Sequence, residues 1–318
     1  MLKNQQIINA HALLEFGSFR KAAHSQNISQ SAFSRSISNL EKYLGVQLFH
    51  RSSTGVTPTI FGEVLLKYST QILVSTKELE REIKILKGLG IGDLAVAMGP
   101  YPAELSGNRA IGRIIANHPN LRCRVCMTDW FEVEKMVLGR SVDLGLAELG
   151  GAVKNRYLEV EPIGVHRFVF FCRSGHPLLK KESLSKADLD QYPLALIKLP
   201  ERIASVFPGR LFKDQGFDYV IPSIEVQELT LSRQIVAESN AFSAATVIQI
   251  ENELKNGTFS IIPFEADWMT LNYGFIFLRN RALSPAAIEY MQIVRHIEND
   301  VRIRNYSLLE TYHVDPQH

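Results

Sequence analysis

The sequence predicts two parts joined by one long helix: an N-terminal segment of three short helices and a hairpin, and a larger α/β body. Three observations support this prediction. Charge is divided unevenly over the 318 residues, because residues 1–90 carry 11 Lys and Arg against 6 Glu, a net charge of +5, whereas residues 91–318 carry a net charge of −3. Apolar residues recur at helical spacing in the first part, and strand-like and helix-like segments alternate in the second.

The composition suits two or three globular domains, since 46% of the residues are hydrophobic. The opening stretch MLKNQQIINAHALLEF places polar residues where a secretory signal needs a continuous apolar region. No apolar run is long enough to span a membrane. Three cysteines in a chain of this length indicate a reducing compartment rather than a disulfide-stabilised fold. We therefore expect a cytoplasmic protein with no membrane partner.

The N-terminal segment has the layout of a helix-turn-helix. Helical spacing predicts helices over residues 2–16, 19–25 and 30–44. Gly17 and Gly45 follow the first and third of these, Asn27 and Ile28 form the predicted turn, and Ser29 is the expected N-cap of the third helix. The stretch QLFHRSSTGVTPT then places turn residues Ser52–Gly55 between two β-prone pieces, as expected of a hairpin wing.

The start of the third helix is rich in small hydroxyl and amide side chains, which allow a helix to enter the major groove of DNA and hydrogen-bond to base edges. Arg51 at the base of the wing is placed to contact the backbone or the minor groove. The predicted DNA-binding residues are Ser29, Gln30, Ser31, Ser34, Arg35, Ser38 and Arg51. The alternative is a three-helix bundle whose polar face is only solvated.

A single long helix follows, over about residues 60–90. Its apolar residues step by three or four positions and make one narrow seam: Phe61, Leu65, Tyr68, Ile72, Thr76, Leu79, Ile83 and Leu86. Gly88 and Gly90 are the expected end of this helix. Pairing with a second copy of the chain would bury such a seam, as in a coiled coil. Packing on the chain's own body is the alternative.

The body alternates predicted strands and helices, which indicates a parallel α/β sheet. Strands are expected in GDLAVAMG, LRCRVCMT, VDLGLAEL, FVFFCR (168–173), PLALIK (193–198), IPSIEV (221–226), AFSAATVI (241–248), TFSIIPF (258–264) and NYGFIFLR (272–279). Helices are expected over 108–118, 132–138, near 203–215, over 228–239 and from Ser284 to about Asn299.

The N-terminal motifs resemble the winged helix-turn-helix of the LysR-type transcriptional regulators. The resemblance rests on Gly17-Ser18-Phe19, Ala22-Ala23, Ser29-Gln30, Ser34-Arg35, Leu40-Glu41, Gly45-Val46-Gln47-Leu48-Phe49-His50-Arg51, Thr57-Pro58-Thr59 and Gly62. Ser31 stands where the family often has Pro. In the body, VDLGLAEL, SGHPL and NELKNGTFSIIPF fall in the family's order.

This resemblance implies three domains: a winged helix-turn-helix over 1–59, a dimerising linker helix over 60–90, and a two-lobed, periplasmic-binding-protein-like effector domain over 91–318. Lobe I is expected over about 92–163 and 268–305, and lobe II over about 164–267. The implied partners are double-stranded DNA, a small-molecule effector, and a second copy of the chain in a dimer or dimer of dimers. RNA polymerase is a further candidate partner.

An effector bound between such lobes would meet the carboxyl ends of strands. The candidate effector-binding residues, by position, are Gly99, Pro100, Tyr101, Thr128, Lys198, Arg202 and Ser243. The first loop reads Gly99-Pro100-Tyr101-Pro102, where family members often have Ser or Thr for a carboxylate, and Ser239-Asn240-Ala241 replaces the usual gly-x-gly. Both departures argue against a simple carboxylate ligand and leave an aromatic, neutral or bulkier ligand, or none.

No catalytic motif is recognised in the sequence. Cys123 and Cys126 form a C-x-x-C within an alternating strand, where residues three apart face opposite sides, and Cys172 lies in an apolar run. We expect no enzyme activity, metal or cofactor. The leading hypothesis is a DNA-binding regulator that senses an effector. The alternatives are an architectural DNA-binding protein with a vestigial cleft, and an α/β ligand-binding protein or enzyme whose basic head binds another anion such as RNA.

Overall fold

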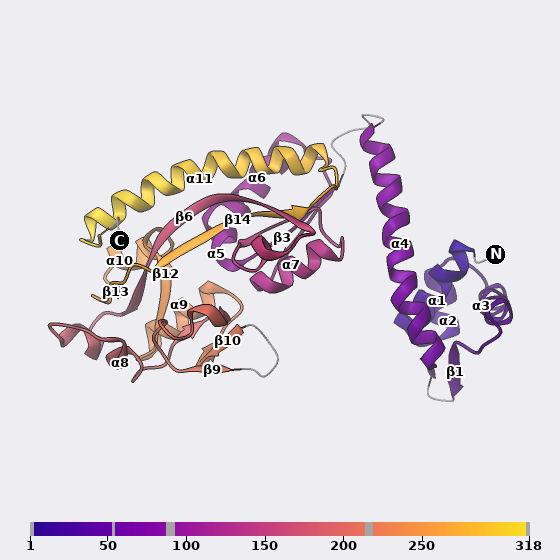
Figure 1. Cartoon of the computed structure of the whole chain (residues 1–318), viewed down its shortest axis with the longest axis horizontal. Helices are drawn as coiled ribbons and strands as arrows, with labels where there is room; N and C mark the ends of the chain where they lie inside the picture. Colours follow the sequence, from indigo (N-terminus) through magenta and orange to yellow (C-terminus); the bar gives the residue numbers. More distant parts are fainter. Residues whose placement is uncertain (1–2, 53–54, 87–92, 214–218, 316–318) are drawn as a thin grey trace. The chain divides into compact units, whose positions relative to one another are not determined.

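The computed structural model describes residues 3–52, 55–86, 93–213 and 219–315. The chain divides into two compact units, Met1–Leu89 and Gly90–His318, each with its own core (Figure 1). Within the described residues, no helix combines the length and the apolar character needed to cross a membrane.

The predicted winged helix-turn-helix is confirmed in unit 1. Its elements are α1 (Asn4–Phe16), α2 (Phe19–Ser25), α3 (Gln30–Leu44), β1 (Phe49–Ser52) and β2 (Gly55–Pro58). Leu13, Ala22, Phe33, Ile37 and Leu40 fill a core between the three helices. Gly17 and Gly45 end α1 and α3 with φ of 58° and 71°, the left-handed region that glycine enters without strain. Residues 53 and 54, inside the predicted turn of the wing, lie outside the described residues.

The connection from the wing into the next helix is closely packed. Thr59 donates its hydroxyl to the carbonyl of Gln47 at 2.7 Å, and the same hydroxyl oxygen accepts a hydrogen bond from the amide of Gly62 at 3.2 Å. A Cβ atom placed on Gly62 would lie 2.2 Å from the carbonyl oxygen of Leu48. Only glycine therefore fits at position 62 without moving the backbone of residue 48.

Helix α4 (Ile60–Leu86) carries the predicted apolar seam. Leu65 packs against the core of unit 1. The other large apolar side chains of the seam are between 41% and 60% exposed: Phe61, Tyr68, Ile72, Leu79 and Ile83. The side chain of Leu86 and the predicted stop at Gly88 and Gly90 lie outside the described residues. The seam is therefore an exposed apolar stripe.

One seven-stranded sheet runs through unit 2, in the order β12-β6-β14-β5-β3-β4, with β13 also paired to β6. The predicted parallel arrangement holds for β3 with β4 and β5, whereas β6, β12 and β14 join antiparallel. The strands of this sheet are β3 (Leu94–Met98), β4 (Cys123–Met127), β5 (Leu144–Glu148), β6 (Leu158–Arg173), β12 (Phe242–Thr246), β13 (Phe259–Ile261) and β14 (Thr270–Leu278). Short strands outside it are β7 (Ala195–Leu196), β8 (Leu199–Pro200), β9 (Leu211–Lys213), β10 (Tyr219–Pro222) and β11 (Ile224–Glu225).

The helices of unit 2 are α5 (Pro100–Pro102), α6 (Asn108–Asn117), α7 (Trp130–Leu138), α8 (Lys186–Leu189), α9 (Leu229–Glu238), α10 (Glu251–Lys255) and α11 (Pro285–Thr311). Of these, α7, α9 and α11 pack directly on strands of the sheet. The short turns of helix are η1 (Ala103–Gly107), η2 (Ala152–Lys154), η3 (Pro177–Lys180), η4 (Glu201–Ile203) and η5 (Val247–Ile250).

The cores of unit 2 separate into two lobes, as predicted. The core of lobe I lies around β3, β5 and the first part of α11, and that of lobe II around the end of β6, β7 and β12. Two long strands, β6 and β14, run from one lobe to the other and can be followed in Figure 1. The strand predicted only over 168–173 is thus the second half of a strand that begins at Leu158.

Helix α11 is a third connection between the lobes, and it is longer than predicted. The sequence predicts its end near Asn299, but the helix continues to Thr311. Its first half contributes Tyr290 and Val294 to the core of lobe I, and its last turns place Leu308 and Leu309 against Val169 and Phe171 of lobe II. The extension exists because lobe II supplies an apolar surface for those turns.

The prediction of a helix near residues 203–215 is wrong. The described residues of that stretch contain turns and the strand β9 instead. Pro208 and Gly209 explain the difference, because proline lacks an amide hydrogen for the helix and Gly209 has a φ of +98°. A Cβ on Gly209 would also lie 2.8 Å from the Cβ of Leu194.

Candidate functional site

The predicted DNA-reading surface is the start of α3. Ser29, Gln30, Ser31, Arg35 and Ser38 are exposed, and Ser34 is half-buried. Ser29 caps the helix by accepting a hydrogen bond from the amide of Ala32 at 3.2 Å. The Arg35 side chain donates to the carbonyl of Ser31 at 3.4 Å, so it lies along the helix face. These residues form one polar surface with one cation, which suits contacts with a groove.

Arg51 is positioned by two neighbours. Its guanidinium lies 4.6 Å from the ring centroid of Phe19, and its Nη2 lies 3.9 Å from a carboxylate oxygen of Glu41. The other oxygen of Glu41 accepts hydrogen bonds from the amides of Leu48 and Phe49, at 2.8 and 3.3 Å. Glu41 and Phe19 therefore hold the exposed Arg51 at the base of the wing, where the sequence predicts a contact with DNA.

The second site is a cavity of about 490 Å³ between the lobes of unit 2. Its walls include Gly99–Pro102, Trp130 and Glu148–Gly150 from lobe I. Phe168, Leu196–Pro200, Arg202, Phe207 and Trp268 contribute from lobe II. A concave, mainly apolar cavity of this size with a few polar groups is typical of small-molecule sites.

Five of the seven predicted effector-binding residues lie in this wall: Gly99, Pro100, Tyr101, Lys198 and Arg202. Thr128 and Ser243 lie outside the wall. The amide of Thr128 is bonded to the carbonyl of Met98 at 3.0 Å, and Ser243 is fully buried in β12. On β12 it is the neighbouring Ala244 that reaches the cavity, because successive residues of a strand face opposite sides.

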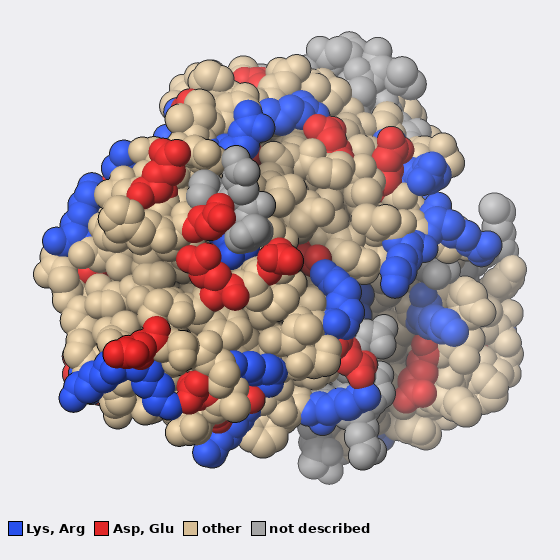
Figure 2. Space-filling view, turned by 60° about the vertical axis from the view of Figure 1, so that its left-hand side comes forward, with Lys and Arg blue, Asp and Glu red and all other residues tan. Residues whose placement is uncertain are grey.

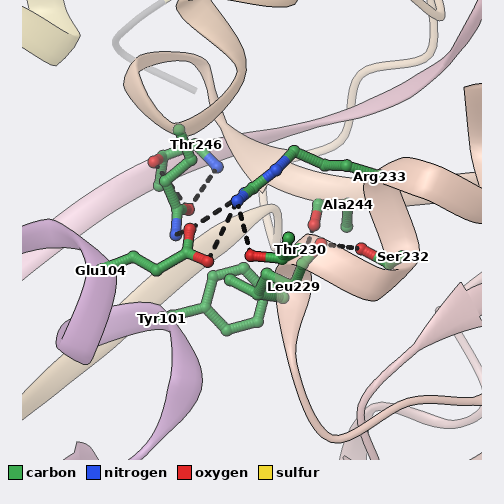
Figure 3. Close-up of polar contacts among 9 residues, drawn as sticks. Tyr101, Glu104, Leu229, Thr230, Ser232, Arg233, Ala244 and Thr246 are labelled. Atoms are coloured by element: carbon green, nitrogen blue, oxygen red, sulfur yellow. Dashed lines mark hydrogen bonds and ion pairs between the residues drawn. The ribbon is translucent and has the colours of Figure 1, made fainter.

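Polar contacts join the two lobes beside the cavity, and Figure 3 shows one group of them. The hydroxyl of Tyr101 donates to the carbonyl of Ala244 at 2.8 Å. Glu104 of η1 faces Arg233 of α9, with N–O distances of 2.9 and 3.2 Å, and also accepts a hydrogen bond from Gln249 at 3.3 Å. Burial, with a smaller contribution from Glu104, raises the pKa of Tyr101 far above its ordinary value. The phenol therefore remains a donor.

A second group of contacts surrounds Lys198. Its ammonium lies 3.7 Å from Asp129 of lobe I and 3.3 Å from Glu225 of lobe II. It also lies over the rings of Phe131 and Tyr219, which stack with centroids 4.9 Å apart. Burial alone would lower the pKa of Lys198, but the hydrogen bond to Glu225 and the charges of Asp129 and Glu225 outweigh it and raise the pKa.

Arg202 forms an ion pair with Glu148, which again joins the lobes. Glu134 of α7 lies behind this pair. Burial, and next the charge of Glu148, raise the pKa of Glu134 to about 7. Oε1 of Glu134 and Oε2 of Glu148 are buried and have no hydrogen-bond partner among the described residues. This end of the cavity therefore holds more carboxylate than cation.

The sequence did not single out the aromatic wall of the cavity. Trp130, Phe168, Phe207 and Trp268 line it, and Trp130 and Trp268 are the only two tryptophans of the chain. Trp130 follows the second predicted strand closely, so its position at a strand end was a usable signal. Phe168, Phe207 and Trp268 are separated in the sequence and meet only through packing, with Phe207 and Trp268 centroids 5.5 Å apart.

The cysteines and the other metal-ligating side chains that the structure describes are dispersed. Among the described residues, no group of three or more His, Cys, Asp or Glu side chains is arranged to hold a metal ion. Cys123, Cys126 and Cys172 are free thiols.

The face of the molecule in Figure 2 carries acidic and basic side chains interspersed, without one continuous basic surface among the residues that it colours.

Comparison with known proteins defines the class. A domain described as "Bacterial regulatory helix-turn-helix protein, lysR family" matches residues 5–63, and "LysR substrate binding domain" matches residues 87–297. The chain is 31% identical over 287 residues to the "SDS degradation transcriptional activation protein" of Pseudomonas sp. (strain ATCC 19151), covering 89% of this chain and 92% of that protein. It is 27% identical to the "HTH-type transcriptional regulator GbpR" of Azospirillum brasilense, covering 92% and 85%.

Solved structures show the same fold. The regulator CbnR, described as a LysR family transcriptional regulator, matches with a TM-score of 0.60 at 15% identity, covering 93% of this chain and 99% of that one. A full-length variant of OxyR from Pseudomonas aeruginosa matches with a TM-score of 0.61 at 16% identity, covering 93% and 97%.

The fold and the two sites define a DNA-binding transcriptional regulator with an effector-binding domain. The chain belongs to the LysR family of transcriptional regulators.

Proposed function

We propose that α3 reads the operator and that the cavity between the lobes binds the small-molecule effector that controls the regulator. The observation that supports this most directly is the cavity itself, because it lies between two lobes that polar contacts join at several points. A ligand that favours one arrangement of those contacts over another changes the populations of the two arrangements. These relatives are transcriptional regulators, which supports a regulatory rather than an enzymatic role.

The proposed DNA contacts divide into two kinds. Gln30, Ser34 and Arg35 read base edges, because they occupy the start of the recognition helix. Arg51 contacts the sugar-phosphate backbone, because it is fixed at the base of the wing by Phe19 and Glu41. Ser29, Ser31 and Ser38 add hydroxyl contacts at the border of this surface. DNA as the partner also supports a cytoplasmic location.

The exposed seam of α4 supports a dimer. Five large apolar side chains remain at least 41% exposed along one helix. Pairing with α4 of a second copy would bury them, as at the seam of a coiled coil. A symmetric dimer would contact two half-sites, and a dimer of dimers would contact four. RNA polymerase contact is proposed as the output step.

The experiment that tests this function is selection of bound duplexes from a random DNA pool by the full-length protein, repeated at several salt concentrations. We expect an interrupted palindrome, because two α3 helices would be related by a two-fold axis. A pool without any motif, bound with a steep salt dependence, would indicate an architectural DNA-binding protein instead. Failure to bind any duplex would contradict the proposal.

A further inference from the structure

We propose that the ligand of the interlobe cavity is an apolar molecule that carries no anionic group. This inference rests on the proposed function of the cavity and specifies the class of effector. Three features of the cavity carry it: the aromatic walls, the first loop of lobe I, and the balance of charge around Lys198 and Arg202.

The walls favour an apolar ligand body. Tyr101 and Trp130 of lobe I face a space closed on the other side by Phe168, Phe207 and Trp268 of lobe II. These three rings contact one another, with centroids 6.2 Å apart for Phe168 and Phe207, 5.5 Å for Phe207 and Trp268, and 6.1 Å for Phe168 and Trp268. Burying apolar ligand surface against such rings is favourable in proportion to the area removed from water. A flat or linear hydrocarbon skeleton therefore gains affinity from every face that it buries.

The first loop offers little to an anion. Pro100 and Pro102 have no amide hydrogen, so two of its backbone positions are lost as donors. The amide of Ala103 already donates to the carbonyl of Gly99 at 3.0 Å. The Tyr101 hydroxyl is the one side-chain donor of this loop, and it is already bonded to the carbonyl of Ala244.

The two cations of the wall are neutralised by the protein itself. Lys198 contacts Asp129 and Glu225, and Arg202 contacts Glu148. Three carboxylates thus surround two cations, and Glu134 adds a fourth acidic group behind Glu148. An anionic ligand would have to displace these carboxylates or remain beside them, and like charges in a partly buried site repel strongly. A neutral ligand meets neither cost.

A matched pair of probes tests the inference. N-phenylnaphthylamine is neutral, and anilinonaphthalenesulfonate has the same two ring systems with an added sulfonate. Both absorb where tryptophan emits, and the only two tryptophans of the chain line the cavity. Titration of the full-length protein, followed by tryptophan quenching and probe emission, gives a dissociation constant for each. We expect the neutral probe to bind at least about tenfold more tightly, which corresponds to ~1.4 kcal/mol.

Three variants test where the probe binds and how charge affects its binding. Ile203→Phe adds bulk to a half-buried position of the wall and should weaken the neutral probe by several-fold. Ile303→Arg, at a 67% exposed position of α11, should leave the tryptophan signal unchanged because that residue is outside the cavity wall and outside the seam of α4. Glu148→Gln removes one negative charge from the wall. It should therefore reduce the ratio between the dissociation constants of the two probes.

The outcomes separate this inference from the proposed function. Equal or tighter binding of the sulfonate would overturn the inference and leave a cavity that binds anions. If neither probe quenched the tryptophan emission, this result would also overturn the inference. Neither result affects the selection of bound duplexes from the random DNA pool. That separate experiment would therefore show whether the proposed regulator function itself fails.

Discussion

Tyr101 of lobe I donates a hydrogen bond of 2.8 Å to the backbone carbonyl of Ala244 in lobe II. The bond ties the loop after β3 to the strand β12 at the wall of the cavity. The sequence predicts that the Tyr101 hydroxyl contacts the ligand, but in the structure this hydroxyl donates its hydrogen bond to lobe II. Tyr101 therefore has a structural role in joining the lobes. The first prediction concerns this bond.

Tyr101→Phe should destabilise unit 2, because the carbonyl of Ala244 loses its partner in a buried site. The expected loss is about 1–3 kcal/mol of unfolding free energy, the cost of leaving a buried acceptor unsatisfied. It is measured by urea unfolding of the full-length protein. Tyr157→Phe is the control, since Tyr157 is 57% exposed and its hydroxyl accepts a hydrogen bond only from neighbouring Arg156 among the described contacts. Equal effects of the two changes would show that the bond contributes nothing specific.

Arg35→Ala should relax sequence preference. Because this side chain is proposed to read a base, the variant should lose about 1–3 kcal/mol of binding free energy for the preferred operator. It should lose little binding free energy for other DNA sequences. Arg51→Ala should instead weaken binding to all sequences to a similar degree. Lys42→Ala serves as a control for the loss of charge, because Lys42 is exposed in the last turn of α3. Unchanged affinity in both the Arg35 and Arg51 variants would refute the assigned DNA surface.

Gly62→Ala should destabilise unit 1, because the new Cβ would lie 2.2 Å from the carbonyl oxygen of Leu48. Relieving such a contact by a backbone shift costs about 1–3 kcal/mol. Thermal unfolding of the full chain, followed by circular dichroism, measures the effect. Gly112→Ala is a matched control, since its Cβ position has no neighbour within 4 Å apart from the adjacent residues and the backbone of its own helix. It should be neutral or stabilise α6 by up to ~1 kcal/mol. A stable Gly62 variant would contradict the packing described for this junction.

Glu134→Gln should make the protein more stable at pH 8. At pH 5 the difference in stability between the variant and the original protein should be smaller. The folded-state pKa of Glu134 is raised to about 7, above that of the unfolded chain, by burial and by Glu148. The folded state then binds more protons between those two values, so stability falls as the pH rises toward and through 7. After discounting for partial solvent exposure, the gain at pH 8 is roughly 1 kcal/mol. Melting temperatures of both proteins across this range decide the matter, and parallel curves would refute it.

Leu79→Arg should dissociate the proposed dimer. A charged side chain in the middle of an apolar seam cannot be buried without a large desolvation penalty. Sedimentation velocity measures the oligomeric state over a range of concentrations. Glu80→Arg introduces the same side chain on the same helix without removing an apolar residue, and it should leave the assembly intact. If the Leu79 variant keeps its oligomeric state, the interface lies elsewhere.

The candidate cavity was only partly predictable. Gly99, Pro100, Tyr101, Lys198 and Arg202 were placed in it from their positions at strand ends, and all of them line it. Thr128 does not line it although it also follows a strand, and from that segment it is Trp130 that reaches the wall. Ser243 failed because alternation along β12 turns the neighbouring Ala244 toward the cavity. Local spacing cannot say which of two adjacent strand residues faces a distant lobe.

The sequence by itself determined the winged helix-turn-helix, the long helix with its apolar seam, and the alternating body. These depend on local signals, such as the caps at Ser29 and Gly45 and the three-to-four-residue spacing on α4. Only the tertiary structure decided the course of α11 to Thr311, because its last turns are stabilised by the apolar surface of lobe II. It also decided the aromatic wall and the paired charges of the cavity. Those groups come from segments far apart in the chain, and only packing brings them together.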